Sequence, residues 1–236
     1  AYCDLFDGQE QPAGKDTAAD VRYRKPYGCR PMIELGSGLS LYSGYFDRKA
    51  QIMLRDAVRD IVLKAPLFQP TMPKTGKALS VKMSNCGALG WVSDRQGYRY
   101  QSRHPVTGDP WPAMPAMLRE LWDKVAEQAP PPQACLINYY EPGAKMSLHQ
   151  DRDETMFTAP VVSVSLGDTC LFRIGGVSRG GATRSFKLQS GDVLVMGGEQ
   201  RLAFHGVDRI YPGTSTLLKA PGRINLTLRR VHQDPV

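Results

Sequence analysis

The stretch Ala159-Pro-Val-Val-Ser-Val-Ser-Leu-Gly-Asp-Thr-Cys-Leu-Phe-Arg-Ile-Gly-Gly176 decides the fold that the sequence predicts. It contains two short runs of mostly apolar residues, 161–166 and 170–174, which are separated by Gly167-Asp168 and end at a glycine pair. Runs of this length that are bounded by turn residues are typical of strands. The stretch therefore predicts two consecutive strands within a β-rich region.

The same pattern continues on both sides of this stretch, from residue 134 onwards. Turn residues such as Pro142-Gly143 and Ser190-Gly191-Asp192 separate most of the runs. Eight or nine strands at this spacing favour a mainly β fold with a double-stranded β-helix (jelly roll) core, the architecture of the cupins. The predicted strands cover 134–140, 145–150, 161–166, 170–174, 185–188, 193–196, 203–205, 215–218 and 224–230.

Two amphipathic helices are predicted ahead of the strands. Asp47 is typical of an N-cap, and the helix that it opens runs to about residue 64, before Pro66. A second helix is predicted from about residue 114 to 127, with Pro115 in its first turn. We expect both to brace one sheet from outside. Their apolar stripes are Ala50, Met53, Leu54, Ala57, Val58, Ile61 and Val62, and Met114, Met117, Leu118, Leu121, Trp122 and Val125.

The composition is that of one globular domain with additions. The chain has 236 residues, of which 42% are hydrophobic and 22% charged, and this is enough for a full core. Residues 1–35 are polar, rich in turn residues and without periodicity, so we expect an N-terminal arm that lacks its own core. A single domain over 36–236 follows, with the jelly roll at about 134–231.

The net charge and the cysteines indicate which partners and which cellular compartment suit the protein. The net charge of +7 and the pI of 9.2 favour a polyanionic partner such as nucleic acid, although a protein that is simply basic has the same composition. Five widely spaced cysteines without a Cys-x-x-Cys pair argue against a disulfide framework or structural zinc, and for a reducing, cytoplasmic setting. No apolar run approaches the ~20 residues of a membrane span, so no membrane partner is expected.

His149, Asp151 and His205 are the candidate metal ligands. His149 and Asp151 stand two residues apart, so their side chains point to one side of an extended segment. His205 can come from a different strand, and Gly206 next to it allows close backbone approach. Two imidazoles and one carboxylate can occupy one face of Fe(II) and leave the other open for a co-substrate and oxygen. A lone His-x-Asp triplet is more often a turn that carries a solvated acid than a metal site, and the distant His205 is what sharpens the metal interpretation.

The run Arg223-Ile-Asn-Leu-Thr-Leu-Arg229 alternates polar and apolar residues. In a strand its four polar residues would face one way, and guanidinium groups can hold the carboxylates of an organic acid in bidentate fashion. The same pattern suits an exposed edge strand that is protected by charges. Together with the metal triplet, the first interpretation indicates an oxygen-activating iron enzyme with a carboxylic-acid co-substrate.

Several motifs, in the same order, resemble the AlkB family of Fe(II)/2-oxoglutarate-dependent dioxygenases in its bacterial branch, which repairs alkylated nucleic acid. The resemblance covers roughly residues 37–230, and Asn85-Cys-Gly with Trp91 and Tyr98 is its most specific part. The motifs are Met83-Ser-Asn-Cys-Gly-Ala-Leu-Gly-Trp91, Arg95-Gln-Gly-Tyr98, Trp111-Pro-Ala-Met-Pro115, Asn138-Tyr-Tyr-Glu-Pro-Gly-Ala-Lys145, His149-Gln-Asp151, Ser163-Val-Ser-Leu-Gly167, His205-Gly206 and the strand 223–229.

The resemblance implies a nucleotide-recognition lid at about 70–112 over the jelly roll, with Fe(II), 2-oxoglutarate and O2 in the active site. His149, Asp151 and His205 would bind the iron as the catalytic triad. Arg223 would pair with the distal carboxylate of 2-oxoglutarate and Arg229 would lie near its metal-bound end. The further residues for this co-substrate are Asn138, Tyr140 and Asn225. Asn138 and Tyr140 could instead be buried residues satisfied by the backbone.

The implied activity is oxidative removal of N-alkyl groups, such as those of 1-methyladenine and 3-methylcytosine, with release of formaldehyde, succinate and CO2. Alkylated DNA, single-stranded DNA first, is the expected partner of a monomeric enzyme, and RNA is a second substrate to test. The residues carried over for substrate binding are Trp91, Tyr98, Tyr100, Asp153 and Arg179, with Arg152 as a further phosphate contact. Without the resemblance, the aromatic trio would suit hairpin packing, and the three charged residues would suit solvated surface.

Two other classes of protein share parts of this pattern. An Fe(II)/2-oxoglutarate hydroxylase of a protein or small molecule would keep the metal site and Arg223 but leave Trp91 and Tyr98 to packing. A jelly-roll binding module would hold no stoichiometric iron and form no succinate. Formaldehyde release from a methylated oligonucleotide separates these classes from a nucleic-acid demethylase.

Overall fold

The computed structural model describes residues 32–126 and 128–233. The elements, in chain order, are β1 (Met32–Gly36), β2 (Leu39–Tyr42), α1 (Arg48–Lys64), β3 (Lys82–Gly87), β4 (Gly90–Asp94), β5 (Gly97–Gln101), α2 (Ala116–Val125), β6 (Ala134–Tyr140), β7 (Met146–His149), β8 (Val161–Gly167), β9 (Thr169–Ile174), β10 (Arg184–Leu188), β11 (Val193–Met196), a 3-10 helix (Gly198–Gln200), β12 (His205–Tyr211) and β13 (Arg223–Arg229).

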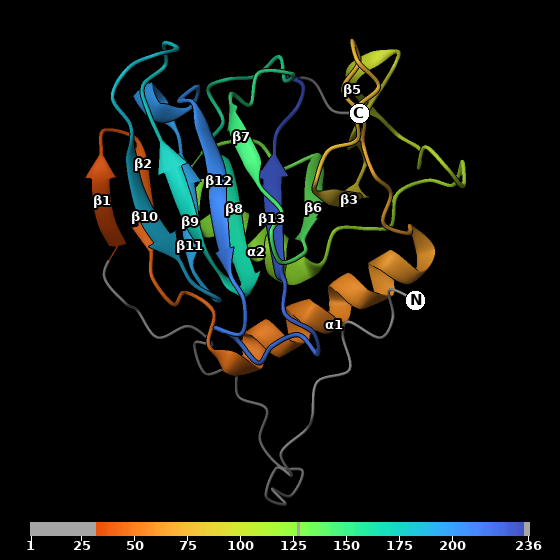
Figure 1. The fold of residues 1–236 in the computed structure, drawn as a ribbon, viewed down its shortest axis with the longest axis horizontal. Coiled ribbons are helices and arrows are strands. Elements are labelled where there is room, and N and C mark those ends of the chain that lie inside the picture. Colours follow the sequence, from red (N-terminus) through yellow and green to blue (C-terminus); the bar gives the residue numbers. More distant parts are fainter. Residues whose placement is uncertain (1–31, 127, 234–236) are drawn as a thin grey trace, which may run out of the picture.

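The strands form the two sheets of a jelly roll, which confirms the predicted fold class (Figure 1). The larger sheet has seven strands in the order β1-β2-β11-β8-β13-β6-β3, and the smaller has four in the order β10-β9-β12-β7. All the strand pairs in both sheets are antiparallel, and several neighbouring strands, such as β2 and β11, are distant in the sequence. A separate two-stranded hairpin, β4–β5, stands apart from both sheets.

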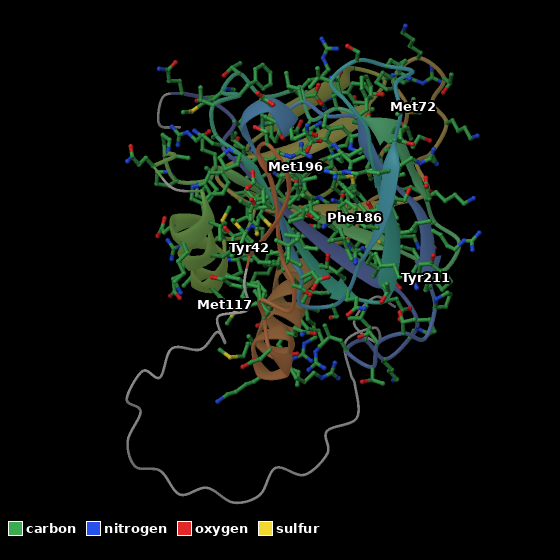
Figure 2. All side chains as sticks on the ribbon, turned by 90° about the vertical axis from the view of Figure 1, so that its left-hand side faces the viewer. Tyr42, Met72, Met117, Phe186, Met196 and Tyr211 are labelled. Carbon is green, nitrogen blue, oxygen red and sulfur yellow. The ribbon has the colours of Figure 1, made fainter. Side chains whose placement is uncertain are left out.

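Helices α1 and α2 cover the outer face of the larger sheet, as predicted. Leu54 and Val58 of α1 and Leu118 of α2 share one apolar cluster with Val164 of β8 and Leu226 of β13. A second cluster fills the space between the two sheets and includes Phe172, Ile174, Met196 and, half-buried beside it, Phe186 (Figure 2). The central strands β11, β8, β13 and β6 of the larger sheet are therefore buried on both faces, whereas the edge strand β1 is mostly exposed.

Most predicted strands are present with shifts of one or two residues, but two predictions were wrong. The strand predicted at 203–205 only begins at His205 and continues to Tyr211. Segment 215–218 is not a strand, because the buried carboxylate of Asp168 accepts the backbone N–H of Ser215 and of Gly222 and curls this loop back onto the sheet. Buried Leu217 and Leu218 explain why the segment has the apolar character of a strand.

The helices also differ in detail from the prediction. Asp47 caps α1 by accepting the backbone N–H of Ala50 at 2.8 Å, as expected. Met53 of the predicted apolar stripe is 52% exposed, because the buried side of α1 turns toward Gln51 instead. Gln51 is tolerated there because its amide donates to the Phe46 carbonyl at 2.8 Å and accepts from Ser190 at 2.7 Å. Pro115 is the N-cap of α2 rather than part of its first turn.

Part of the predicted N-terminal arm belongs to the jelly roll. Residues 32–35 lie in β1, which pairs with β2 at the edge of the larger sheet, so the prediction of an arm was wrong for these four residues. The remainder of the arm, 1–31, lies outside the described residues. No helix in the described ranges is long and apolar enough to cross a membrane.

The pairing of β7 with β12 brings two of the candidate metal ligands together. His149 and His205 are direct partners in the register of these antiparallel strands. Gly206 makes the close approach possible, because a Cβ atom at this position would lie 2.4 Å from the carbonyl oxygen of Met146. The predicted role of Gly206 is therefore confirmed.

Candidate active site

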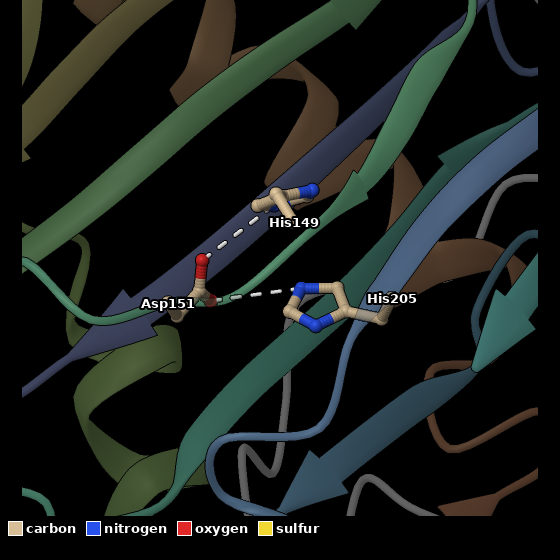
Figure 3. A group of neighbouring side chains, drawn as sticks. All are labelled: His149, Asp151 and His205. Carbon is tan, nitrogen blue, oxygen red and sulfur yellow. Dashed lines mark ion pairs between the residues drawn. The ribbon is translucent and has the colours of Figure 1, made fainter. Parts of the chain in front are cut away.

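The three candidate metal ligands converge on the inner surface of the smaller sheet (Figure 3). Each offers one ligand atom, and these atoms all lie within 4.8 Å of one another. The Nε2 atom of His149 lies 3.6 Å from Oδ1 of Asp151, and Nε2 of His205 lies 3.8 Å from Oδ2 of the same carboxylate. Segments 149–151 and 205 thus meet in space as the sequence predicts.

Backbone carbonyls orient both imidazoles. The Nδ1 atom of His149 lies 2.9 Å from the carbonyl oxygen of Ser147, and Nδ1 of His205 lies 2.9 Å from that of Ala203. A carbonyl can only accept a hydrogen bond, so each Nδ1 carries the proton. Each Nε2 is then left with a free lone pair on the side of Asp151, and a ring whose other N–H donates to a carbonyl is usual for histidines that bind a metal.

The charges around Asp151 keep it ionised although it is buried. Burial by itself raises the pKa of this carboxyl, but the nearby guanidinium charge of Arg229 outweighs that effect and holds the pKa well below its usual range. Burial, assisted by the neighbouring His149, lowers the pKa of His205 to about 4. The site thus combines an anionic oxygen ligand with an imidazole that stays neutral at physiological pH.

A divalent cation fits these donors. The Oδ2 atom of Asp151 is buried and has no hydrogen-bond partner among the described residues. An unpaired buried carboxylate oxygen is costly unless a cation compensates it. Two imidazole nitrogens and one carboxylate on one side are typical of a non-haem Fe(II) site with open positions.

The polar side chains of β13 face the space between the two sheets. Its apolar residues Ile224, Leu226 and Leu228 pack in the cluster beneath the helices, so the polar residues point the opposite way. Arg223 is 1% exposed and donates to the Ser165 hydroxyl at 2.7 Å. The alternative of an exposed edge strand is wrong, because β13 lies between β8 and β6.

Arg223 lies in a cradle that an organic carboxylate would complete. Among the described residues no acid forms an ion pair with it, and its Nε atom has no hydrogen-bond partner. Tyr140 and Asn138 are the register partners of Arg223 and Asn225 on β6. In the described part of the chain the Tyr140 hydroxyl donates only to the Met146 sulfur at 3.6 Å, and Nδ2 of Asn138 donates to Oδ1 of Asn225 at 3.4 Å. Buried donors without strong acceptors fit a carboxylate-bearing co-substrate.

Arg229 contacts the metal triad directly. Its Nη2 atom lies 2.7 Å from Oδ1 of Asp151, and its Nη1 atom lies 3.0 Å from Oε1 of Glu154 and 2.8 Å from the Tyr100 hydroxyl. The pairing with Asp151 raises the pKa of the guanidinium, although burial by itself lowers it. The arginine at this end of β13 therefore connects the metal ligand with two further residues.

Glu154 and Arg201 are functional candidates that the sequence analysis missed. Glu154 is fully buried, and it accepts hydrogen bonds from Tyr100, Arg229 and Arg201. Arg201 also donates to the backbone carbonyls of Asp151 at 2.8 Å and of Ala159 at 2.9 Å. An acid next to two charged residues and an isolated arginine have no distinctive spacing, so no sequence signal pointed to this network.

The β4–β5 hairpin brings the three aromatic candidates over the site. Trp91 and Tyr100 are register partners, and the Trp91 and Tyr98 rings stack with centroids 5.7 Å apart. The indole N–H of Trp91 donates to Oδ2 of Asp153 at 2.8 Å, while Tyr100 donates its hydroxyl to Glu154. Burial raises the pKa of Tyr100 well above its ordinary value, so it stays a donor. Tyr98 is 47% exposed and free to contact a ligand.

The remaining substrate candidates lie on the surface. Arg179 is exposed in the loop between β9 and β10, and its guanidinium carbon lies 5.0 Å from the centre of the Phe204 ring. Arg152 and Asp153 are exposed on the loop that carries Asp151. Of the predicted lid, 70–112, the segment β3 forms the edge of the larger sheet, whereas β4 and β5 form the hairpin over the site.

Comparison with known proteins agrees with this geometry. The model of the 2OG-Fe(II) oxygenase superfamily matches residues 38–229. The chain is 53% identical, over 193 residues, to a protein of Caulobacter vibrioides named alpha-ketoglutarate-dependent dioxygenase AlkB homolog, with 82% of this chain and 87% of that one covered. It is 42% identical to the AlkB dioxygenase of Escherichia coli, with 83% and 91% covered. The solved structure of OsALKBH1 superposes with a TM-score of 0.72 at 31% identity, and covers 85% of this chain and 100% of its own.

Proposed function

The chain belongs to the 2OG-Fe(II) oxygenase superfamily, and we propose that it is a dioxygenase that repairs N-alkylated bases of DNA. The substrates are 1-methyladenine and 3-methylcytosine, and the products are the repaired base, formaldehyde, succinate and CO2. The observation that supports this proposal most strongly is that unsatisfied groups for a metal and for an organic acid face the same space between the two sheets. They are Oδ2 of Asp151 for the metal, and Nε of Arg223 for the acid.

We assign His149, Asp151 and His205 to Fe(II), and Arg223, Asn225, Asn138, Tyr140 and Arg229 to 2-oxoglutarate. When bound, the ferrous ion and this co-substrate supply the oxidation of the alkyl carbon by O2. The protein contributes orientation and water exclusion. The carbonyls of Ser147 and Ala203 hold the imidazoles in place, and the buried cradle around Arg223 sets the position of the acid.

The β4–β5 hairpin serves base recognition in this proposal. Trp91 and Tyr98 provide aromatic surface for an extruded base, and methylation lowers the cost of extrusion because it has already broken the base pair. Asp153 accepts a hydrogen bond from the exocyclic amine of the base, and its negative charge favours the cationic lesion. Exposed Arg179 and Arg152 then neutralise flanking phosphates, so binding weakens as salt rises.

We propose single-stranded DNA as the preferred partner, since the hairpin offers stacking surface for unpaired bases, with methylated RNA as the second class to test. We further propose a monomer that acts in the cytoplasm. The buried thiols of Cys86, Cys135 and Cys170 are free, which supports a reducing compartment.

The decisive experiment reconstitutes the protein with Fe(II) under anaerobic conditions. Oxygen is then admitted with 2-oxoglutarate and single-stranded, double-stranded or RNA oligonucleotides that carry one methylated base. We expect formaldehyde and succinate in equal amounts with methylated oligonucleotides and none with Asp151→Ala. Asp208→Ala is the matched control, because Asp208 pairs with Arg173 outside the metal triad. Formaldehyde-free turnover with a peptide or small molecule would instead establish a hydroxylase.

A further inference from the structure

Two hydrogen bonds fasten the β4–β5 hairpin to the loop that follows the metal ligand Asp151. The Trp91 indole N–H donates to Oδ2 of Asp153 at 2.8 Å, and the Tyr100 hydroxyl donates to Glu154. Trp91 and Tyr100 are opposite each other in the hairpin, and the acids that receive them are consecutive in the chain. The hairpin therefore has two fixed points on one short segment.

The two fixed points differ in their surroundings. Glu154 is fully buried, and both its carboxylate oxygens are engaged, by Arg229 and Tyr100 on one side and by Arg201 on the other. Asp153 is exposed, and in the described part of the chain its only hydrogen-bond partner is Trp91. The contact with Glu154 thus lies in a buried carboxylate with no free oxygen, whereas the contact with Asp153 leaves one carboxylate oxygen available.

We propose that Trp91 is a specificity-determining residue that positions Asp153. Its indole N–H holds Oδ2 and leaves Oδ1 for the exocyclic amine of a cationic damaged base. This inference rests on the proposed function and deepens it, because it identifies what fixes the choice among lesions. The Trp91 ring is itself fixed by the stack with Tyr98, so the direction of its N–H group is set before a base arrives.

Two related lesions differ in the group that would face Asp153, so discrimination between them can be measured. 3-Methylcytosine is cationic and carries an amine, whereas 3-methylthymine is neutral and carries a carbonyl at the same position. A fixed carboxylate oxygen attracts the first and repels the second. An exposed aspartate that rotates freely spends part of its time turned away, so it discriminates less.

The test compares kcat/KM for two single-stranded oligonucleotides that differ only in this lesion. We expect Trp91→Phe to lower the ratio of 3-methylcytosine to 3-methylthymine repair by about fivefold, or about 1 kcal/mol. In the Asp153→Ala background the same substitution should leave the ratio unchanged. Tyr100→Phe is the matched control, because loss of the Glu154 contact should lower both rates alike. The proposal is overturned if Trp91→Phe acts equally in both backgrounds, or leaves the ratio intact.

A second variant tests the orientation without loss of the tryptophan. In Asp153→Asn the indole N–H should hold the amide oxygen and turn the amide N–H₂ toward the base, which favours the carbonyl of 3-methylthymine. In the double variant with Trp91→Phe the amide is free to flip, so the ratio of 3-methylcytosine to 3-methylthymine repair should return toward one. A reversal that persists unchanged in the double variant contradicts the proposal.

Binding gives a readout that does not depend on turnover. Fluorescence anisotropy with the same labelled oligonucleotides and iron-free protein should show the same fall in the affinity ratio for Trp91→Phe. If the wild-type enzyme releases no formaldehyde from either oligonucleotide, the proposed function fails. The affinity ratio still decides whether Trp91 positions Asp153.

Discussion

Arg229 and Asp151 form a buried ion pair, with Nη2 and Oδ1 2.7 Å apart. The arginine at the end of β13 therefore holds the same carboxylate that we assign to the metal, and it also contacts the buried Glu154. Arg229 is the ion-pair partner of Asp151 in this buried region, and it shares the compensation of Glu154 with Arg201. The charges of β13, which we assign to the organic acid, and of the metal site are consequently coupled.

Replacement of Arg229 by Leu should destabilise the metal-free protein strongly. Breaking a buried pair leaves an uncompensated charge, which typically costs about 3–5 kcal/mol. Mn(II), a surrogate for Fe(II) that is stable in air, should restore part of this loss, since the cation compensates Asp151. Urea denaturation with and without Mn(II) measures both effects. Arg173→Leu, which removes a surface pair with Asp208, should cost far less stability than Arg229→Leu. Equal costs for the two variants would contradict the electrostatic argument.

Replacement of Arg223 by Leu should raise the KM for 2-oxoglutarate while Fe(II) binding persists. Removal of one partner of a buried charged contact costs about 2–5 kcal/mol, so we expect an increase of about 30-fold or more. Succinate formation as a function of 2-oxoglutarate concentration measures it. Arg184→Leu, an exposed position on β10, is the control and should leave KM unchanged. If KM rises only for the oligonucleotide, the assignment of Arg223 to 2-oxoglutarate is wrong.

The stability of the metal-free protein should fall between neutral pH and pH 4 through His205. Burial, with the nearby His149, lowers the pKa of this imidazole from 6.5 to about 4. Between these values the unfolded chain binds a proton that the folded protein does not, so stability increases with pH in this window. The effect amounts to about 3 kcal/mol. Denaturation at pH 7 and pH 4.5 should show a smaller pH dependence for His205→Asn, whereas exposed His232→Asn should behave like wild type.

Replacement of Gly206 by Ala should separate the two histidines. Its Cβ atom would lie 2.4 Å from the Met146 carbonyl, so β12 must move away from β7 and carry His205 with it. We expect a loss of about 1–3 kcal/mol in stability and a weaker affinity for Mn(II), which isothermal titration can measure. Gly181→Ala is the control, because a Cβ atom there meets nothing within 4 Å. Unchanged metal affinity in Gly206→Ala would show that the strand spacing is not critical.

The sequence was sufficient for features that depend on local pattern. Alternation in 223–229 predicted a strand with one polar face, because side chains alternate whatever the rest of the chain does. Turn residues located most strands, and the spacing of His149 and Asp151 predicted a shared side. The pattern failed where a tertiary contact overrides it. Segment 215–218 is apolar because it is buried, but the carboxylate of Asp168 prevents it from extending as a strand.

By itself, the sequence determined the alternating strands, the side shared by His149 and Asp151, and the polar face of β13, since each depends on residues that are near one another along the chain. Only the tertiary structure decided which groups satisfy one another. It placed His205 opposite His149, joined Arg229 to Asp151, buried Glu154 between two arginines and brought Trp91 to Asp153. These partners come from different sheets and from the hairpin, 50 or more residues apart in most cases. Burial makes such pairs strong only after the whole fold has excluded water, and no short stretch of sequence contains that information.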